Sequence, residues 1–415
     1  MRVLHALLVA AALSAFGAPP AARSQSPQPA TIQTDGEALV ISVLTFGQGD
    51  PLWEKFGHNA LRIRDARTGS DVAYNWGTFD FEQPNFVGRF LTGNTLYWLD
   101  SVSAPLMIEY YSARLNRTGV EQVLALTPPE AARLRDYVEW NVRPENRNYR
   151  YDYFVDNCST RLRDVIDRGL AGHLRRSLAA MPSPHTFRSE SLRLVDAMPL
   201  VQAGMHVALG EPADERLTGW EESFVPMRLM ERMRAVRRAD GRPLVASETV
   251  LYTATRAAEA ERAGTLAGRF LVTGLLLAGI IALLAWRGAR AGLAVMGVLW
   301  GVLAGVMGIV LATAWAATRH IFWYRNENLL QLLPLALLLV VVVPMALRRA
   351  WWRRAGLALA VVLAGASMLG LVLKPLPMFE QRNLAVILFA LPVHVALAWA
   401  LWRLRARDET RVAAR

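Results

Sequence analysis

The chain has 415 residues, of which 53% are hydrophobic, and a formal net charge of +11. Much of the positive charge lies in short segments between long apolar runs near the C-terminus, which indicates the cytoplasmic loops of a membrane protein. We therefore expect the membrane as a partner and no nucleic acid. The single cysteine excludes an internal disulfide.

Residues 1–22 have the order of a secretory signal peptide, with Arg2 before an apolar run, Val3 to Phe16, and small residues after it. Residues 23–37, rich in Ser, Pro, Gln and Thr, are expected to form a flexible lead-in. Export places the next segment in an oxidising compartment, where a lone cysteine forms an intermolecular bridge or remains a free reactive thiol. We favour the reactive thiol.

Residues 38–235 are expected to form a periplasmic catalytic domain in which helices and strands are mixed. Alternating or β-branched apolar residues, bounded by glycines and turns, predict strands at 38–46, 58–63, 71–81 and 121–126. Thr127-Pro-Pro-Glu130 has the pattern of a helix N-terminus, and that helix is expected to end before Pro144. Further along, Arg188 and Asp214 are expected to form an ion pair.

The only cysteine, Cys158, is expected at the N-terminus of an amphipathic helix. Apolar residues recur after it at helical spacing, at Leu162, Val165, Ile166 and Leu170. At such a position, unpaired backbone N–H groups and the helix dipole favour a thiolate. The aromatic residues before it alternate as in an extended strand, and a cysteine between such a run and a helix is where a papain-like fold has its nucleophile. The alternative is a small buried hydrophobic side chain.

His58 is the expected partner of Cys158 in a Cys-His dyad, in which the imidazole takes the thiol proton and later gives it to the leaving group. It begins a strand beside a turn, whereas the other histidines lie in the signal peptide, in an apolar run or in segments without strand context. The alternative is a turn histidine with one face in solvent.

A third residue is expected to fix the imidazole tautomer, and Asn75 on the neighbouring predicted strand is our choice. Asn75 could equally cap the turn at Gly77. Other carboxylates and amides compete for the role: Glu54, Asp80, Asp156 and Asn157.

Four stretches resemble the N-terminal periplasmic domain of the Lnb-type lipoprotein N-acyltransferases: 56–62, 74–81, 143–146 and 149–161. The order of His before Cys is also similar to the circularly permuted papain-like thiol enzymes that include lecithin:retinol acyltransferase and the NlpC type. The resemblance covers roughly residues 38–235 and implies a permuted papain-like α+β fold. It also implies a thiol acyltransferase acting on lipids, in which His58 and Cys158 match the catalytic positions.

Five apolar runs, each near the roughly 20 residues that a spanning helix needs, predict an all-α membrane domain over residues 266–403. The helices are expected at 270–286, 291–318, 329–347, 355–373 and 384–402. Residues 236–265 are expected to form a linker helix before them, and 404–415 a cytoplasmic tail. Arginines are concentrated in alternate connections and in this tail, which places the large domain in the periplasm and the C-terminus in the cytoplasm.

The loop before the third run, residues 319–328, is similar to a loop of the same family. Arg319 or Arg325 could hold a phosphate, and Asn326 and Asn328 could contact substrate or cap the helix that follows. Asn157, next to the thiol, is also expected to contact substrate. The alternative for the loop is interfacial anchoring by its aromatic residues.

Three functions remain open from the sequence. The first is transfer of an acyl chain from a phospholipid to the α-amine of the N-terminal cysteine of a diacylated lipoprotein, through a thioester on Cys158, at the inner membrane. The second is a periplasmic Cys-His hydrolase, either a phospholipase or a cell-wall peptidase, and the third is a non-enzymatic membrane assembly factor. Neither a metal site nor a nucleotide-binding motif is recognisable, so we expect no cofactor.

Overall fold

The computed structural model describes residues 36–413, with side chains described as far as Ala406. These residues belong to one compact unit. The predicted signal peptide and nearly all of the predicted flexible lead-in lie outside the described residues.

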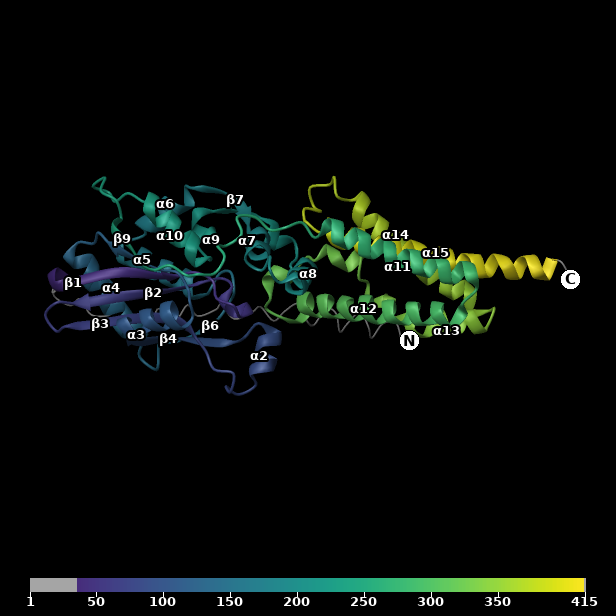
Figure 1. The fold of residues 1–415 in the computed structure, drawn as a ribbon, viewed down its shortest axis with the longest axis horizontal. Helices are drawn as coiled ribbons and strands as arrows, with labels where there is room; N and C mark the ends of the chain where they lie inside the picture. Colours follow the sequence, from purple (N-terminus) through teal and green to yellow (C-terminus); the bar gives the residue numbers. More distant parts are fainter. Residues whose placement is uncertain (1–35, 414–415) are drawn as a thin grey trace, which may run out of the picture. The chain divides into compact units, whose positions relative to one another are not determined.

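The N-terminal half contains a seven-stranded antiparallel sheet with the strand order β6-β4-β3-β2-β1-β5-β9 (Figure 1). The strands are β1 (Leu39–Phe46), β2 (His58–Asp65), β3 (Ser70–Thr78), β4 (Leu96–Ser103), β5 (Gly119–Leu124), β6 (Asn148–Arg150) and β9 (Val245–Tyr252). The four strands predicted from alternation correspond to β1, β2, β3 and β5. A separate hairpin pairs β7 (Pro182–Thr186) with β8 (Arg216–Thr218).

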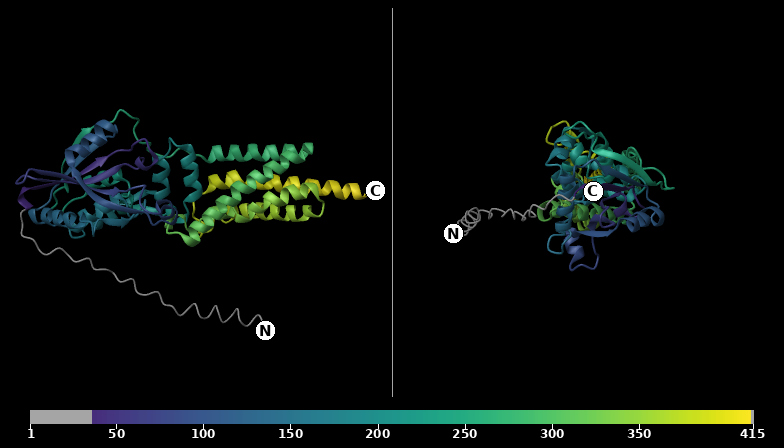
Figure 2. Two further views of the ribbon diagram at one scale, coloured as in Figure 1. Left: turned by 90° about the horizontal axis from the view of Figure 1, so that it is seen from below. Right: turned by 90° about the vertical axis from the view of Figure 1, so that its left-hand side faces the viewer.

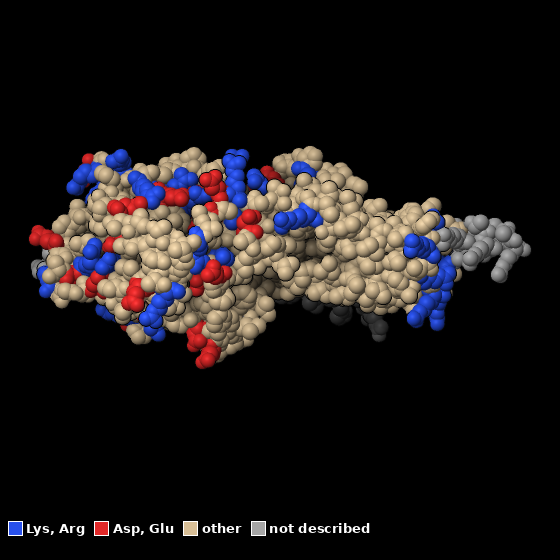
Figure 3. Space-filling view, in the orientation of Figure 1, with Lys and Arg blue, Asp and Glu red and all other residues tan. Residues whose placement is uncertain are grey.

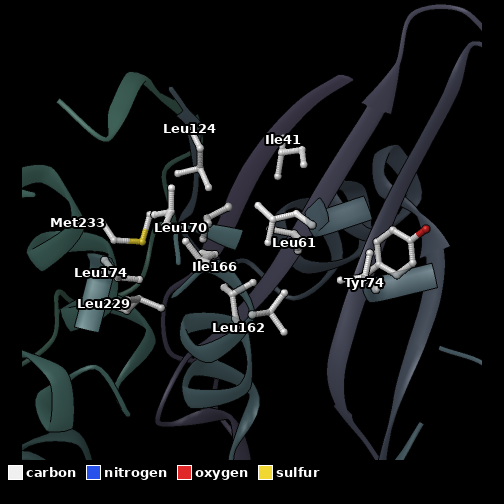
Figure 4. Packing of buried hydrophobic residues seen from close by; sticks show 14 of the residues in the cluster. Ile41, Leu61, Tyr74, Leu124, Leu162, Ile166, Leu170, Leu174, Leu229 and Met233 are labelled. Atoms are coloured by element: carbon white, nitrogen blue, oxygen red, sulfur yellow. The ribbon is translucent and has the colours of Figure 1, made fainter. Parts of the chain in front are cut away.

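Two helices close one face of this sheet over the main core. They are α4 (Pro128–Asn141), which begins where predicted and has a capping box at Thr127, and α5 (Cys158–Gly169). Figure 4 shows Leu162 and Ile166 of α5 facing Leu61 of β2, and all three side chains are fully buried. This packing orients α5 and thereby sets the direction of its first turn.

The remaining helices of this half are short. They are α2 (Phe86–Thr92), α3 (Ala104–Glu109), α6 (His173–Ala179), α7 (Phe187–Leu194), α8 (Pro199–Ala208), α9 (Gly219–Glu222) and α10 (Pro226–Ala235). The predicted ion pair is confirmed, because Nε of Arg188 lies 2.9 Å from Oδ1 of Asp214 and both side chains are buried.

The predicted linker helix over residues 236–265 is wrong, because this segment contains strand β9. β9 pairs antiparallel with β5, and its Glu248 accepts a hydrogen bond from Gln122 of β5 at 2.8 Å. Without β9, the backbone of β5 would be an open sheet edge. β5 precedes β9 by more than a hundred residues in the chain. The segment's Arg, Ala and Glu content suggested a helix, but a distant pairing partner decides the structure.

The C-terminal half has five helices that are long and apolar enough to cross a membrane, as predicted. They are α11 (Ala267–Arg287), α12 (Arg290–Ala317), the span Glu327–Arg348, α14 (Trp352–Val372) and α15 (Leu384–Ala413). The third span is composite, with 3-10 turns η6 (Glu327–Leu330) and η7 (Pro334–Leu338) before α13 (Leu339–Arg348). Figures 1 and 2 show these helices running side by side.

Close packing in this bundle depends on small residues. A methyl group on Gly305 of α12 would lie 2.5 Å from the backbone nitrogen of Leu337, so glycine is needed where α12 meets η7. Arginines gather at the end of the bundle where α11 connects to α12 and α13 connects to α14 (Figure 3). They include Arg287, Arg290, Arg348 and Arg349.

Candidate active site

Cys158 is the first residue of α5, as predicted. Oδ1 of Asn157, the residue before it, accepts hydrogen bonds from the backbone N–H groups of Ser159 at 2.9 Å and Thr160 at 3.0 Å. The hydroxyl of Thr160 in turn accepts a hydrogen bond from the backbone of Asn157 at 2.8 Å, which completes a capping box. Asn157 therefore fixes the helix start and with it the position of the cysteine.

His58 is the first residue of β2 and reaches the same place from the sheet. The next residue, Asn59, donates its side-chain amide to the hydroxyl of Ser159 at 3.1 Å, which ties β2 to the first turn of α5. Gly57, just before the strand, has φ +81° and would bring a methyl group within 2.9 Å of the carbonyl oxygen of Phe46. Only glycine fits there, so this turn defines where β2 begins.

Asn75 of β3 holds the imidazole. Its Oδ1 lies 2.5 Å from Nε2 of His58. Because an amide oxygen only accepts hydrogen bonds, Nε2 must carry a proton, and Nδ1 is left as the basic nitrogen. Asn75 thus occupies the place predicted for the third residue, and the prediction that it serves catalysis stands on this contact.

Gly77 lies where the three elements meet. It is the extra residue of a bulge between Trp76 and Thr78 in the pairing of β3 with β4, and its φ is +99°. A methyl group placed on it would lie 3.5 Å from Cβ of Cys158 and 3.8 Å from Cε1 of His58. The cysteine and the imidazole therefore flank a single small space, which a side chain at residue 77 would fill.

The competing carboxylates have partners other than the imidazole. Oδ1 of Asp80 accepts a hydrogen bond from the backbone of Glu82, and Asp156 forms a bidentate ion pair with Arg161. Glu54 faces Arg117 at 3.6 Å.

Arg117 and Tyr111 complete the surroundings of the imidazole. The ring of Tyr111 stacks on that of His58, with centroids 5.4 Å apart and planes 3° apart. The guanidinium of Arg117 lies 4.8 Å from the centroid of the same tyrosine ring and donates to the carbonyl of Gly47 at 2.7 Å. Neither residue could be predicted from the sequence, since nothing near Arg117 in the sequence distinguishes it from the chain's many other arginines.

Burial and charge determine the protonation of the pair. Burial, together with the nearby positive charge of Arg117, lowers the pKa of His58 to about 4, although the bond to Asn75 opposes this. Burial also raises the pKa of the Cys158 thiol, and backbone N–H groups of Asn59 and Ser159 and the charge of Arg117 only partly oppose it. The predicted preference for a thiolate is therefore wrong at rest, because desolvation outweighs the helix terminus. The resting pair is a neutral thiol beside a neutral imidazole.

The residues predicted to contact substrate are occupied by the protein itself. Asn157 donates its amide to the carbonyl groups of Tyr153 and Phe224, besides capping α5. Asn326 accepts from the backbone of Asn328, which is the capping role considered as an alternative. These contacts indicate structural roles, and direct contact with substrate remains a prediction.

Asn326 and Asn328 join the membrane helices to the end of α8. Both are fully buried, and their amides donate to the backbone carbonyl groups of His206, Val207 and Ala208 at 2.9–3.0 Å. These carbonyls belong to the last turn of α8, which lacks intrahelical partners. The two halves of the described chain are thus connected by buried hydrogen bonds.

The two arginines of this loop have different surroundings. Arg325 is half exposed and forms an ion pair with Glu211 at 2.9 Å. Arg319 lines a cavity of about 660 Å³ together with Arg150, Asp156 and Tyr324. Aspartates and arginines are equally represented in the lining of this cavity, and contact between Arg319 and a phosphate remains a prediction.

One further cluster has metal-ligating side chains. Ligand atoms of His185, Glu190 and Glu222 lie within 4.8 Å of one another. Arginines already pair with both carboxylates: Arg193, Arg228 and Arg232. Three guanidinium groups leave no net negative charge for a cation, so this cluster is a buried ion network.

Residues 26–190 match the family model described as the Lnb N-terminal periplasmic domain. No curated protein and no solved structure matches the chain. The matched region contains His58, Asn75 and Cys158, and the relation to permuted papain-like enzymes remains a prediction. The match is consistent with the Lnb-type family, and the matched region is followed in the chain by five helices that could span a membrane.

Proposed function

We propose that the protein is a thiol acyltransferase of the inner membrane that moves an acyl chain from a phospholipid to the α-amine of a diacylated lipoprotein. The observation that carries this proposal is the meeting of Cys158, His58 and Asn75 at Gly77, in a domain attached to membrane-spanning helices. The family match supports the choice of a lipid-linked reaction over other thiol chemistry.

In the first half-reaction, Nδ1 of His58 takes the thiol proton while the sulfur of Cys158 attacks the ester carbonyl carbon. The bond between that carbon and the glycerol oxygen then breaks, and the oxygen receives the proton from His58. A lysophospholipid leaves, and the acyl chain remains on the sulfur as a thioester. Backbone N–H groups near the sulfur, that of Asn59 among them, support the transient oxyanion.

In the second half-reaction, the neutral α-amine of the acceptor attacks the thioester carbonyl. His58 accepts a proton from the amine, the carbon–sulfur bond breaks, and the sulfur recovers the proton as a thiol. An amide is formed and the enzyme returns to its starting state. Asn75 holds the imidazole by Nε2, so that Nδ1 remains the basic nitrogen in both steps.

The test uses full-length protein in vesicles that contain phospholipid with isotopically labelled acyl chains and a synthetic diacylated lipopeptide. We expect a labelled acyl mass on the protein, sensitive to neutral hydroxylamine, and an N-acylated lipopeptide that requires both Cys158 and His58. His173→Gln is the matched control, since Nε2 of that imidazole bonds to the backbone carbonyl of Arg237 at the surface.

Two results would overturn the proposal. Release of labelled free fatty acid without any N-acylated lipopeptide would indicate a hydrolase instead. Full complementation of cells lacking the protein by Cys158→Ser would indicate a non-enzymatic role.

A further inference from the structure

Helix α2, between β3 and β4, exposes an unusual amount of apolar surface. None of its seven residues is buried. Val87 is 68% exposed, Phe90 57% and Leu91 62%. A surface helix of a soluble domain normally turns its apolar side chains inward, so this face lacks its partner among the described residues.

The C-terminal end of α2 is attached to the place where a spanning helix ends. The backbone N–H of Arg319 donates to the carbonyl of Thr92 at 2.9 Å, and Nε2 of His320 lies 3.0 Å from the carbonyl of Phe90. Arg319 follows the last residues of α12 directly. The end of a spanning helix marks the bilayer surface, so α2 lies at that level.

An aromatic row runs from α2 toward the thiol. Its ring centroids are separated by 6.3 Å (Phe90–Phe86), 5.2 Å (Phe86–Phe81), 4.8 Å (Phe81–Phe79), 4.8 Å (Phe79–Tyr97) and 4.1 Å (Tyr97–Tyr151). Phe79 of this row lies two residues after Gly77, and a methyl group added to Gly77 would lie 3.5 Å from Cβ of Cys158. Tyr97, Tyr151 and Cys158 also pack against the same buried core. The row therefore extends from α2 to the surroundings of the thiol.

We propose that α2 inserts its apolar face among the phospholipid acyl chains of the adjacent leaflet, and that the aromatic row guides one such chain to Cys158. Continuity with the spanning surface favours lipid as the occupant over a protein. Interfacial helices bind membranes through such apolar faces. The guiding role rests on the proposed acyl transfer, whereas the insertion of α2 does not.

Insertion can be measured without any activity. Cys158 is the only cysteine, so Cys158→Ser gives a background in which Phe90→Cys carries one fluorescent label. In vesicles of phosphatidylethanolamine and phosphatidylglycerol, doxyl-labelled lipid should quench this label and aqueous iodide should not. Val250→Cys on β9 is the control, because Val250 is 59% exposed on the strand at the opposite sheet edge from β6.

Equal lipid quenching at positions 90 and 250 would overturn the insertion of α2. Shielding of position 90 from both quenchers would point to a protein partner, such as a second copy of this chain, and would also overturn it.

The guiding role has its own test in the protein with Cys158 present. Phe90→Glu combined with Leu91→Glu should slow thioester formation from bilayer phospholipid about tenfold or more, given the usual contribution of a buried large apolar side chain. Acylation by a soluble short-chain ester should be unchanged, and Val250→Glu should affect neither reaction. Equal rates from bilayer phospholipid in the double variant and the unmodified protein would overturn the guiding role. In that case, acyl transfer itself would still stand.

Discussion

Replacing Gly77 with alanine should damage catalysis far more than stability. With φ at +99°, an alanine costs about 1–2 kcal/mol of folding free energy, which lowers Tm by roughly 2–8 °C. The added methyl group meets Cβ of Cys158 at 3.5 Å and Cε1 of His58 at 3.8 Å, which are ordinary contact distances. The methyl group therefore clashes with neither side chain in the folded protein, but it fills the space between the thiol and the imidazole.

The acylated form of Cys158 needs that space, and displacement of reacting groups by about 1 Å can cost on the order of 100-fold in rate. We expect a loss of that size in thioester formation, followed by intact-protein mass spectrometry with labelled phospholipid. Gly69→Ala is the matched control, because Gly69 has φ +71° and no atom within 4 Å of an added methyl group. It should lose similar stability and keep its activity. If both variants acylate at the same rate, our placement of the reaction at Gly77 is incorrect.

Three more predictions follow from the contacts described above. Burial raises the pKa of the Cys158 thiol above its ordinary 9.0, so the rate of its alkylation by iodoacetamide should still increase with pH at pH 9. A rate that reaches its plateau below pH 8 would contradict the neutral resting thiol. Asn75→Ala should slow thioester formation about 100-fold at unchanged Tm, since the imidazole loses the hydrogen bond that holds its Nε2. An unchanged rate would rule out a positioning role. Asp214→Asn should lower the free energy of unfolding, measured with denaturant, by about 3–5 kcal/mol, because Arg188 is left buried without a counter-charge. The control Asp50→Asn changes a carboxylate that is 85% exposed and should lower it by under about 1 kcal/mol. Equal losses in the two variants would contradict this prediction.

Elements could be predicted from the sequence where the residues that determine them lie close together in the chain. The helix after Cys158 and the strand begun by His58 could be predicted, because apolar spacing, a capping residue and a turn glycine lie within a few residues of each. The five spans were equally visible, since length and apolarity alone define them. Even Asn75 could be chosen by its place on the neighbouring strand, and the structure does put it on the imidazole.

Features that depend on distant segments could not be predicted. β9 forms because β5 offers it a pairing edge, although its own composition also suits a helix. Only the fold brings the charge of Arg117 near the imidazole, and the sign of the thiol pKa shift depends on how much protein surrounds the sulfur. A helix N-terminus is readable in a sequence, whereas the desolvation that opposes it is a sum over the whole site.

The neutral resting pair constrains how the reaction can begin. Moving a proton from a thiol whose pKa is raised by burial to an imidazole whose pKa is lowered to about 4 is strongly unfavourable if each group ionises alone. Attraction between the resulting charges offsets only part of that cost in a partly buried site. The remainder has to come from the substrate, as charge passes from sulfur to the carbonyl oxygen during attack. Proton transfer and carbon–sulfur bond formation should therefore be concerted, and the thiol should react slowly with small alkylating reagents even where it is acylated quickly by a bound ester.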